Sequence, residues 1–160
     1  RELRREYTMM LGEEKAEYYL NKFDKLTASR KKLSLNWAGL LFSTYWCFYR
    51  KLFLPGAVFL LLNFAGLYLV LMKPDLALLG NMISVIPTVI CGFFGNYLYM
   101  MYVQKSIVVA NQLATTEKER YYANNGGTSM RIVLGILAAM LFFAMALFFS
   151  AGPEVIERMS

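Results

Sequence analysis

The chain has 160 residues, the length of one soluble domain, but its composition argues against such a domain. Hydrophobic residues make up 58% of it, above the roughly 45–50% that soluble domains usually contain. The net charge of +6 would suit an anionic membrane face, whereas no basic patch typical of a folded nucleic-acid reader is visible, so we expect no nucleic-acid partner.

Residues 1–32 are predicted to form a short cytoplasmic helical region. Apolar residues recur there at helical spacing, with charged residues on the other side of the helix; they are Ala16, Tyr19, Leu20, Phe23 and Leu26. We interpret this segment as a solvated helix that lies either on the rest of the protein or on lipid headgroups. The basic triplet Arg30–Lys32 follows it and should lie near anionic lipid.

Residues 33–51 are predicted to form an amphipathic helix rich in aromatic residues. Asn36, Ser43 and Arg50 recur every seven residues and would make a narrow polar stripe on this helix. Tryptophan and tyrosine prefer the headgroup level, where the ring is buried and its polar atom stays wet. We therefore predict a set of lipid-interface anchors in this segment, namely Trp37, Tyr45, Trp46, Tyr49, Arg50 and Lys51.

Three uncharged apolar blocks are long enough to cross a bilayer, because about 20 helical residues span the ~30 Å hydrocarbon core. We predict transmembrane helices over residues 52–72, 76–103 and 131–152. A tight turn at residues 73–75 joins the first two, and a cytoplasmic helix and loop over residues 104–130 precede the third. In that stretch the helix is expected to continue as far as Asn124. We expect residues 153–160 to form an external tail and residues 33–160 together to make the membrane domain.

Small and mildly polar residues recur along the predicted crossings, a pattern typical of close helix packing. The predicted helix-packing residues are Gly66, Asn81, Gly92, Gly95, Gly135 and Ala139. They would pack against a second copy or a partner membrane protein. The alternative is a polar track in an oligomeric channel or transporter component, and its residues would be Asn63, Asn81, Ser84, Thr88 and a carbonyl freed by a kink at Pro87.

The basic residues predict the orientation of the chain. Residues 1–51 and 104–131 hold 15 of the 17 lysines and arginines, which places the N-terminus and the long loop in the cytoplasm and the C-terminus outside. In this arrangement residues 33–51 form an interfacial or shallow re-entrant helix. If the segment spanned the bilayer instead, the inside-to-outside count would fall from 15:2 to 11:6. The charge rule favours the interfacial or re-entrant placement.

No motif for catalysis, metal binding or cofactor binding is visible. The chain has no histidine, the commonest general base and metal ligand. All acidic residues lie outside the predicted crossings, so these lack the ionisable group that a proton-coupled carrier needs. Cys47 and Cys91 fall in apolar helical stretches; no disulfide is expected in a cytoplasm-facing region, and both are expected to be ordinary buried residues. We therefore expect neither an enzyme nor a bound metal or cofactor.

Two blocks of the sequence carry a resemblance to a known family. The first block comprises residues 34–38 (SLNWA), Tyr45–Trp46 and Tyr49–Lys51, and the second comprises residues 95–99 (GNYLY) followed by Lys105. Together they resemble a family of small bacterial membrane proteins catalogued as domain of unknown function number 2628. The resemblance spans about residues 18–110 and implies a bacterial inner-membrane protein with a short helical fold. It implies no activity, and the zinc ribbon of some relatives has no matching cysteine pairs here.

Overall fold

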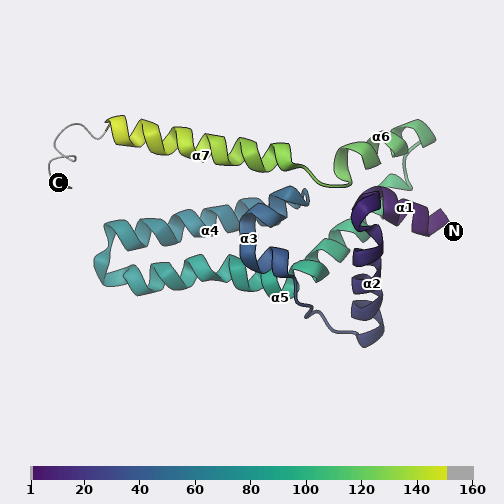
Figure 1. Cartoon of the computed structure of the whole chain (residues 1–160), viewed down its shortest axis with the longest axis horizontal. Coiled ribbons are helices and arrows are strands. Elements are labelled where there is room, and N and C mark those ends of the chain that lie inside the picture. Colours follow the sequence, from purple (N-terminus) through teal and green to yellow (C-terminus); the bar gives the residue numbers. More distant parts are fainter. Residues whose placement is uncertain (1, 151–160) are drawn as a thin grey trace. The chain divides into compact units, whose positions relative to one another are not determined.

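The computed structural model describes residues 2–150, with side chains as far as residue 146, and every element in that range is helical (Figure 1). The prediction of an all-helical fold is confirmed for these residues. The end of the predicted third crossing, residues 151–152, and the predicted tail, residues 153–160, lie outside them. The chain divides into two compact units at the boundary between Ser129 and Met130, and each is described by itself.

The N-terminal region contains two helices where one short helix was predicted. Helix α1 spans Glu2–Leu11 and helix α2 spans Glu13–Ser29. Gly12 separates them with a φ of 81°, a conformation that glycine adopts at little cost. The apolar face of α2 buries Tyr19 and Phe23, whose rings lie 4.9 and 6.1 Å from the ring of Tyr99 on helix α5 (Ala77–Ala110). Helix α2 therefore lies on the rest of the protein.

Helix α3 spans Trp37–Tyr49 but is not one straight helix. Asn36 caps its N-terminus, because the side-chain oxygen accepts a hydrogen bond of 3.0 Å from the backbone N–H of Gly39. Ser43, with φ 43° and ψ −114°, breaks the helix into two short halves. Thirteen residues of α-helix rise only about 20 Å, so α3 is too short to cross the ~30 Å core of a bilayer.

Helices α4 (Phe53–Met72) and α5 form an antiparallel hairpin, joined by the short 3₁₀ helix η1 (Pro74–Leu76) (Figure 1). The backbones touch where Gly66 of α4 meets Gly80 of α5. A Cβ atom added at either glycine would lie 2.6 Å from the other's carbonyl oxygen, which is inside van der Waals contact. Helix α3 packs against both helices of the hairpin, and α1 and α2 contact α5.

Within the described residues, two helical stretches, Phe53–Met72 and Pro74–Ala110, are long and apolar enough to cross a membrane, or three if the last two described helices are taken as one bent span. Helix α5 continues beyond the predicted end of the crossing at residue 103 and ends at Ala110, and its C-terminal part buries Val103 and Ile107. The predicted continuation of this helix to Asn124 is wrong. Residues 111–114 turn the chain, and helix α6 begins anew at Thr115 and ends at Asn125.

The second unit begins with helix α7, which spans Met130–Ser150. Large apolar side chains cover much of its described surface, among them Leu134, Leu137 and Leu141. Gly135 has open space around it, since a Cβ atom added there would meet nothing within 4 Å. By itself α7 is therefore a largely apolar helix whose described side chains lie mostly outside any core.

Candidate functional site

An extended linker connects α2 to α3 and is fixed along α5 by hydrogen bonds. The backbone N–H groups of Ser34 and Asn36 donate to the carbonyl oxygens of Phe93 (2.9 Å) and Gly92 (2.8 Å). The fully buried side-chain amide of Asn96 donates to the hydroxyl of Ser34 (3.0 Å) and to the carbonyl of Leu35 (3.2 Å). One asparagine on α5 thus holds the entrance to α3.

Glycines on α5 allow α3 to approach its backbone closely. A Cβ atom added at Gly92 would lie 2.6 Å from a terminal methyl carbon of Leu40. One added at Gly95 would lie 2.8 Å from the side-chain nitrogen of Asn36 and 3.3 Å from the ring of Trp46. Both glycines therefore serve packing within the chain, between α3 and α5.

The second half of α3 is held between α4 and α5. The side-chain amide of Asn63 on α4 donates to the hydroxyl of Thr44 over 3.0 Å. Trp46 is buried, and its ring centroid lies 6.2 Å from that of Tyr99 in an edge-to-face arrangement. This half is therefore anchored on both sides, and the break at Ser43 lies directly before it.

Arg50, at the C-terminal end of α3, is a buried cation surrounded by tyrosine rings. Its guanidinium carbon lies 4.5 Å from the ring centroid of Tyr19, 5.4 Å from that of Tyr99 and 5.5 Å from that of Tyr49. The residue is only 4% exposed, and no carboxylate in the described part of the chain pairs with it. Ring faces and the carbonyl of Leu11, 3.5 Å from Nη1, are its neighbours instead.

Tyr19 brings the N-terminal helices into this cluster. Burial raises the pKa of its hydroxyl, and the nearby charge of Arg50 offsets part of that rise. The charge of Arg50 therefore acts on groups from α2, α3 and α5 at once. We call the region where these helices meet the α3–α5 junction and define it by Asn36, Trp46, Arg50, Gly95, Asn96 and Tyr99.

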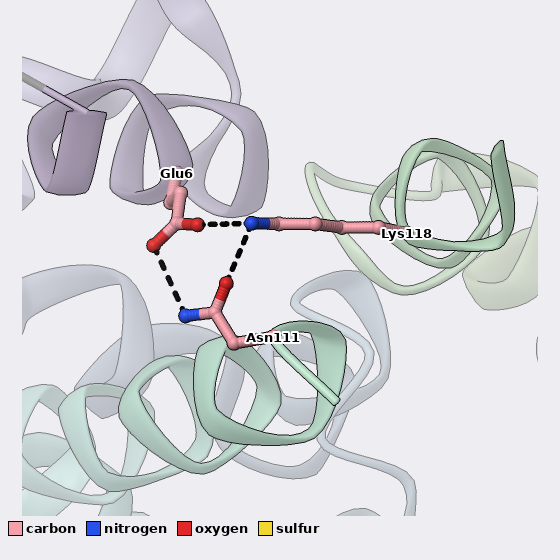
Figure 2. Close-up of polar contacts among 3 residues, drawn as sticks. All are labelled: Glu6, Asn111 and Lys118. Atoms are coloured by element: carbon pink, nitrogen blue, oxygen red, sulfur yellow. Dashed lines mark hydrogen bonds and ion pairs between the residues drawn. The ribbon is translucent and has the colours of Figure 1, made fainter. Parts of the chain in front are cut away.

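A second polar cluster joins α1, α5 and α6 (Figure 2). The Lys118 amine lies 2.5 Å from Oε1 of Glu6 and 2.5 Å from the side-chain oxygen of Asn111. The amide of Asn111 in turn donates to Oε2 of Glu6 over 3.4 Å. Glu6 is 5% exposed, and its hydrogen bond raises the pKa of Lys118. Glu6, Asn111 and Lys118 thus hydrogen-bond to one another. We call these three residues the clamp and regard their role as structural.

The segment after α6 is attached to the ends of α1 and α3. The Lys51 amine donates to the carbonyls of Asn124 (2.9 Å) and Gly126 (2.6 Å), and burial lowers its pKa. The backbone N–H of Ser129 donates to the carbonyl of Tyr49 over 3.0 Å. Lys51 is therefore engaged with the C-terminus of α6, where its positive charge also complements the helix dipole.

The six predicted lipid anchors do not share one exposed face. Trp37 is 65% exposed, whereas Trp46 and Arg50 are buried in the junction. Tyr45, Tyr49 and Lys51 are half-buried. These residues do not share a face because α3 is broken at Ser43. The predicted polar stripe assumed one straight helix.

The predicted helix-packing residues fall into three groups. Gly66, Gly92 and Gly95 contact other helices of the same chain, Asn81 is exposed on α5, and Gly135 and Ala139 are exposed on α7. Of the alternative polar track, Asn63 bonds to Thr44, and the hydroxyl of Ser84 bonds to the carbonyl of Gly80 over 3.1 Å. Helix α5 is continuous through Pro87. We find no specific observation that favours a channel.

Sequence reasoning found the residues of the junction but not their contacts. Both blocks that carry the family resemblance meet there, since Asn96 of the second block binds the start of the first, and Tyr99 lies beside Trp46 and Arg50. The occurrence of both blocks in one sequence was the one available signal for the contact between them.

Among the described residues, no three side chains of the types His, Cys, Asp or Glu gather where they could hold a metal ion.

Residues 8–105 match the family described as "Protein of unknown function (DUF2628)". The match includes both sequence blocks and the whole α3–α5 junction, and it stops before the Asn111 and Lys118 members of the clamp. Neither a curated protein nor a solved structure matches the chain.

Proposed function

The chain belongs to the family described as "Protein of unknown function (DUF2628)", whose match covers more than half of it, and we propose that it is a non-enzymatic protein of the bacterial inner membrane. Its α4–α5 hairpin crosses the bilayer, and α3 enters one leaflet from the cytoplasmic side and returns. Helices α1, α2 and α6 form a cytoplasmic lobe on the C-terminal part of α5. The protein acts by packing against a second copy or a partner membrane protein.

The observation that carries this proposal is the outer surface of the hairpin. No charged residue occurs from Leu52 to Met72 or from Leu76 to Gln104, and large apolar side chains point away from the protein. Leu54 is 77% exposed, Leu78 75% and Leu61 69%. A monomeric soluble protein rarely exposes an apolar surface of this extent, whereas lipid chains would cover it at no cost.

The charges of the rest of the chain support the orientation. Arg30–Lys32 begin the linker to α3, and the Lys32 amine lies 5.6 Å from the ring centroid of Tyr97 on α5. Lys105 is exposed about two turns further along the same helix. These cations would lie at the cytoplasmic headgroups, where each contributes about 1 kcal/mol of attraction to anionic lipid.

A labelling experiment tests the topology. In a background in which Cys47 and Cys91 are changed to serine, Ser29→Cys places a thiol on the lobe and Asp75→Cys places one in the hairpin turn. A membrane-impermeant maleimide added to intact cells should label the Asp75→Cys variant at once and the Ser29→Cys variant only after the membrane is opened. Equal labelling of both in intact cells would overturn the proposed topology.

A second experiment tests assembly. Gly135 and Ala139 of α7 lie on one side of that helix, and a Cβ atom added at Gly135 would meet nothing within 4 Å. Gly135→Leu should therefore shift the oligomer profile in mild detergent towards smaller species, because a bulky side chain prevents close helix approach. Ala144→Leu, on the opposite side of α7, is the matched control and should leave the profile unchanged. An unchanged profile in Gly135→Leu would count against assembly through α7.

A further inference from the structure

The two cysteines of the chain meet in the interior. Cys47 lies on the second half of α3 and Cys91 lies in the middle of α5, and both are fully buried. Their sulfur atoms are 3.5 Å apart, although 44 positions separate them in the sequence. No other cysteine exists in the chain, so neither has a competing partner within it.

The surrounding contacts hold the two thiols in this position. A Cβ atom at Gly39 would clash with the carbonyl oxygen of Cys91, so the backbones of α3 and α5 already approach as closely as they can beside the pair. The bond between Asn63 and Thr44 fixes the turn of α3 that precedes Cys47. A disulfide has a sulfur–sulfur bond of about 2.05 Å, so the sulfurs need to approach by roughly 1.5 Å, a change that side-chain rotation and small shifts supply.

We propose that Cys47 and Cys91 are a reversible dithiol–disulfide pair that locks α3 onto α5. On oxidation the two S–H bonds break and one S–S bond forms. The two electrons and two protons pass to an apolar two-electron oxidant of the quinone class, which becomes a hydroquinone. An uncharged dithiol small enough to reach the buried disulfide reverses the reaction and is itself oxidised to a disulfide.

Burial determines which oxidants can act. Thiol–disulfide exchange requires a thiolate and access to its sulfur, and both sulfurs are shielded from water. A charged oxidant such as glutathione disulfide should therefore react slowly, whereas an oxidant that dissolves in lipid or detergent reaches the pair. The disulfide would close a loop that contains all of α4, which restricts the unfolded chain and raises the unfolding temperature.

The test uses the purified full-length protein in detergent. A fully substituted quinone, which cannot add to thiols, is supplied, with copper–phenanthroline and oxygen as a faster oxidant in a parallel sample. After denaturation, free thiols are counted with a maleimide and the intact mass is measured. We expect both thiols to disappear together in a monomer that is two hydrogen masses lighter, and a dithiol reductant to restore both. Glutathione disulfide should give less than a tenth of this reaction in the same time.

Three variants control for position. Cys47→Ser and Cys91→Ser each leave one buried thiol, which should survive the treatment. Val89→Cys in the Cys91→Ser background keeps two thiols but places one on the exposed side of α5, so no intramolecular disulfide should form. The proposal is overturned if the unaltered protein keeps both thiols while a soluble dithiol in the same tube is oxidised. It is equally overturned if disulfide-linked dimers form in place of the lighter monomer. The same holds if the Val89→Cys variant forms an intramolecular disulfide as fast as the unaltered protein.

Discussion

The buried side-chain nitrogen of Asn96 lies 3.0 Å from the hydroxyl oxygen of the partly buried Ser34. This contact joins the middle of α5 to the linker that leads into α3, and the same amide also reaches the carbonyl of Leu35. A buried amide in this position satisfies polar groups that the extended linker would otherwise leave unpaired in an apolar setting. Asn96 is thus the residue on which the entry of α3 depends most directly.

We predict that Asn96→Leu destabilises the protein by about 2–3 kcal/mol in free energy of unfolding, because it removes two hydrogen bonds from a buried amide to partly buried acceptors. The size of the side chain is nearly kept, so loss of hydrogen bonds dominates over loss of packing. Unfolding in mixed micelles of mild detergent and dodecyl sulfate measures the change. Asn81→Leu removes an exposed amide from the same helix and should alter stability by less than about 0.5 kcal/mol. Equal losses in the two variants would contradict the role given to Asn96.

The ends of the helices were predictable where charges mark them. Lys51 and Lys73 bracket an uncharged apolar run, and α4 fills that run almost completely, from Phe53 to Met72. The α5–α6 break was not predictable from such marks. It exists because α6 folds back and brings Lys118 to Glu6, a residue 112 positions away, and no local pattern records that contact.

The interior of the α3–α5 junction was also not predictable from local sequence patterns, even for single residues. Periodicity placed Asn36, Ser43 and Arg50 on one stripe, which is correct only for a straight helix. The conformation of Ser43, with a positive φ, is held by contacts on either side of it, such as the bond between Thr44 and Asn63. Because these contacts come from a distant helix, the pattern that located the segment could not show that Arg50 would be buried.

For Arg50 we predict that the tyrosine rings matter more than the charge itself. Arg50→Met removes both the cation–π contacts and the cost of burying a charge, so its net effect on stability should be small, within about 1 kcal/mol. Tyr99→Leu keeps the buried charge and removes a ring that faces it, so it should destabilise the protein by about 3 kcal/mol or more. Unfolding free energies of both variants give the comparison. Tyr99→Phe keeps the ring and serves as the control. A larger loss in Arg50→Met than in Tyr99→Leu would contradict this prediction.

The clamp predicts a loss of stability at high pH. The pKa of Lys118 is raised by its hydrogen bond with Glu6 in the folded protein, so the folded state binds this proton more tightly than the unfolded state does. The contribution of this charged pair to the free energy of unfolding is therefore complete below the ordinary lysine pKa of about 10.4. It is lost as the pH rises through the higher pKa of Lys118 in the folded protein. Lys118→Met should flatten the stability profile above about pH 10 relative to the unaltered protein. Buried tyrosines also titrate there, so the difference between the two proteins is the quantity to measure, by thermal unfolding at stepped pH. Parallel profiles would exclude the clamp as a source of stability.

A lysine on the outer surface of the hairpin gives the most direct check of membrane insertion. Leu61 is 69% exposed near the middle of α4, the position where a charge would lie deepest in the hydrocarbon. A lysine at the centre of a transmembrane helix costs about 2.5–3.5 kcal/mol of insertion free energy, so Leu61→Lys should sharply reduce the fraction of chain that resists alkaline extraction from membranes. Leu3→Lys makes the same substitution at a residue that is 60% exposed on α1 and should leave that fraction unchanged. If both variants remained equally resistant, water rather than lipid would face Leu61, because only an aqueous surface accepts a lysine there without loss.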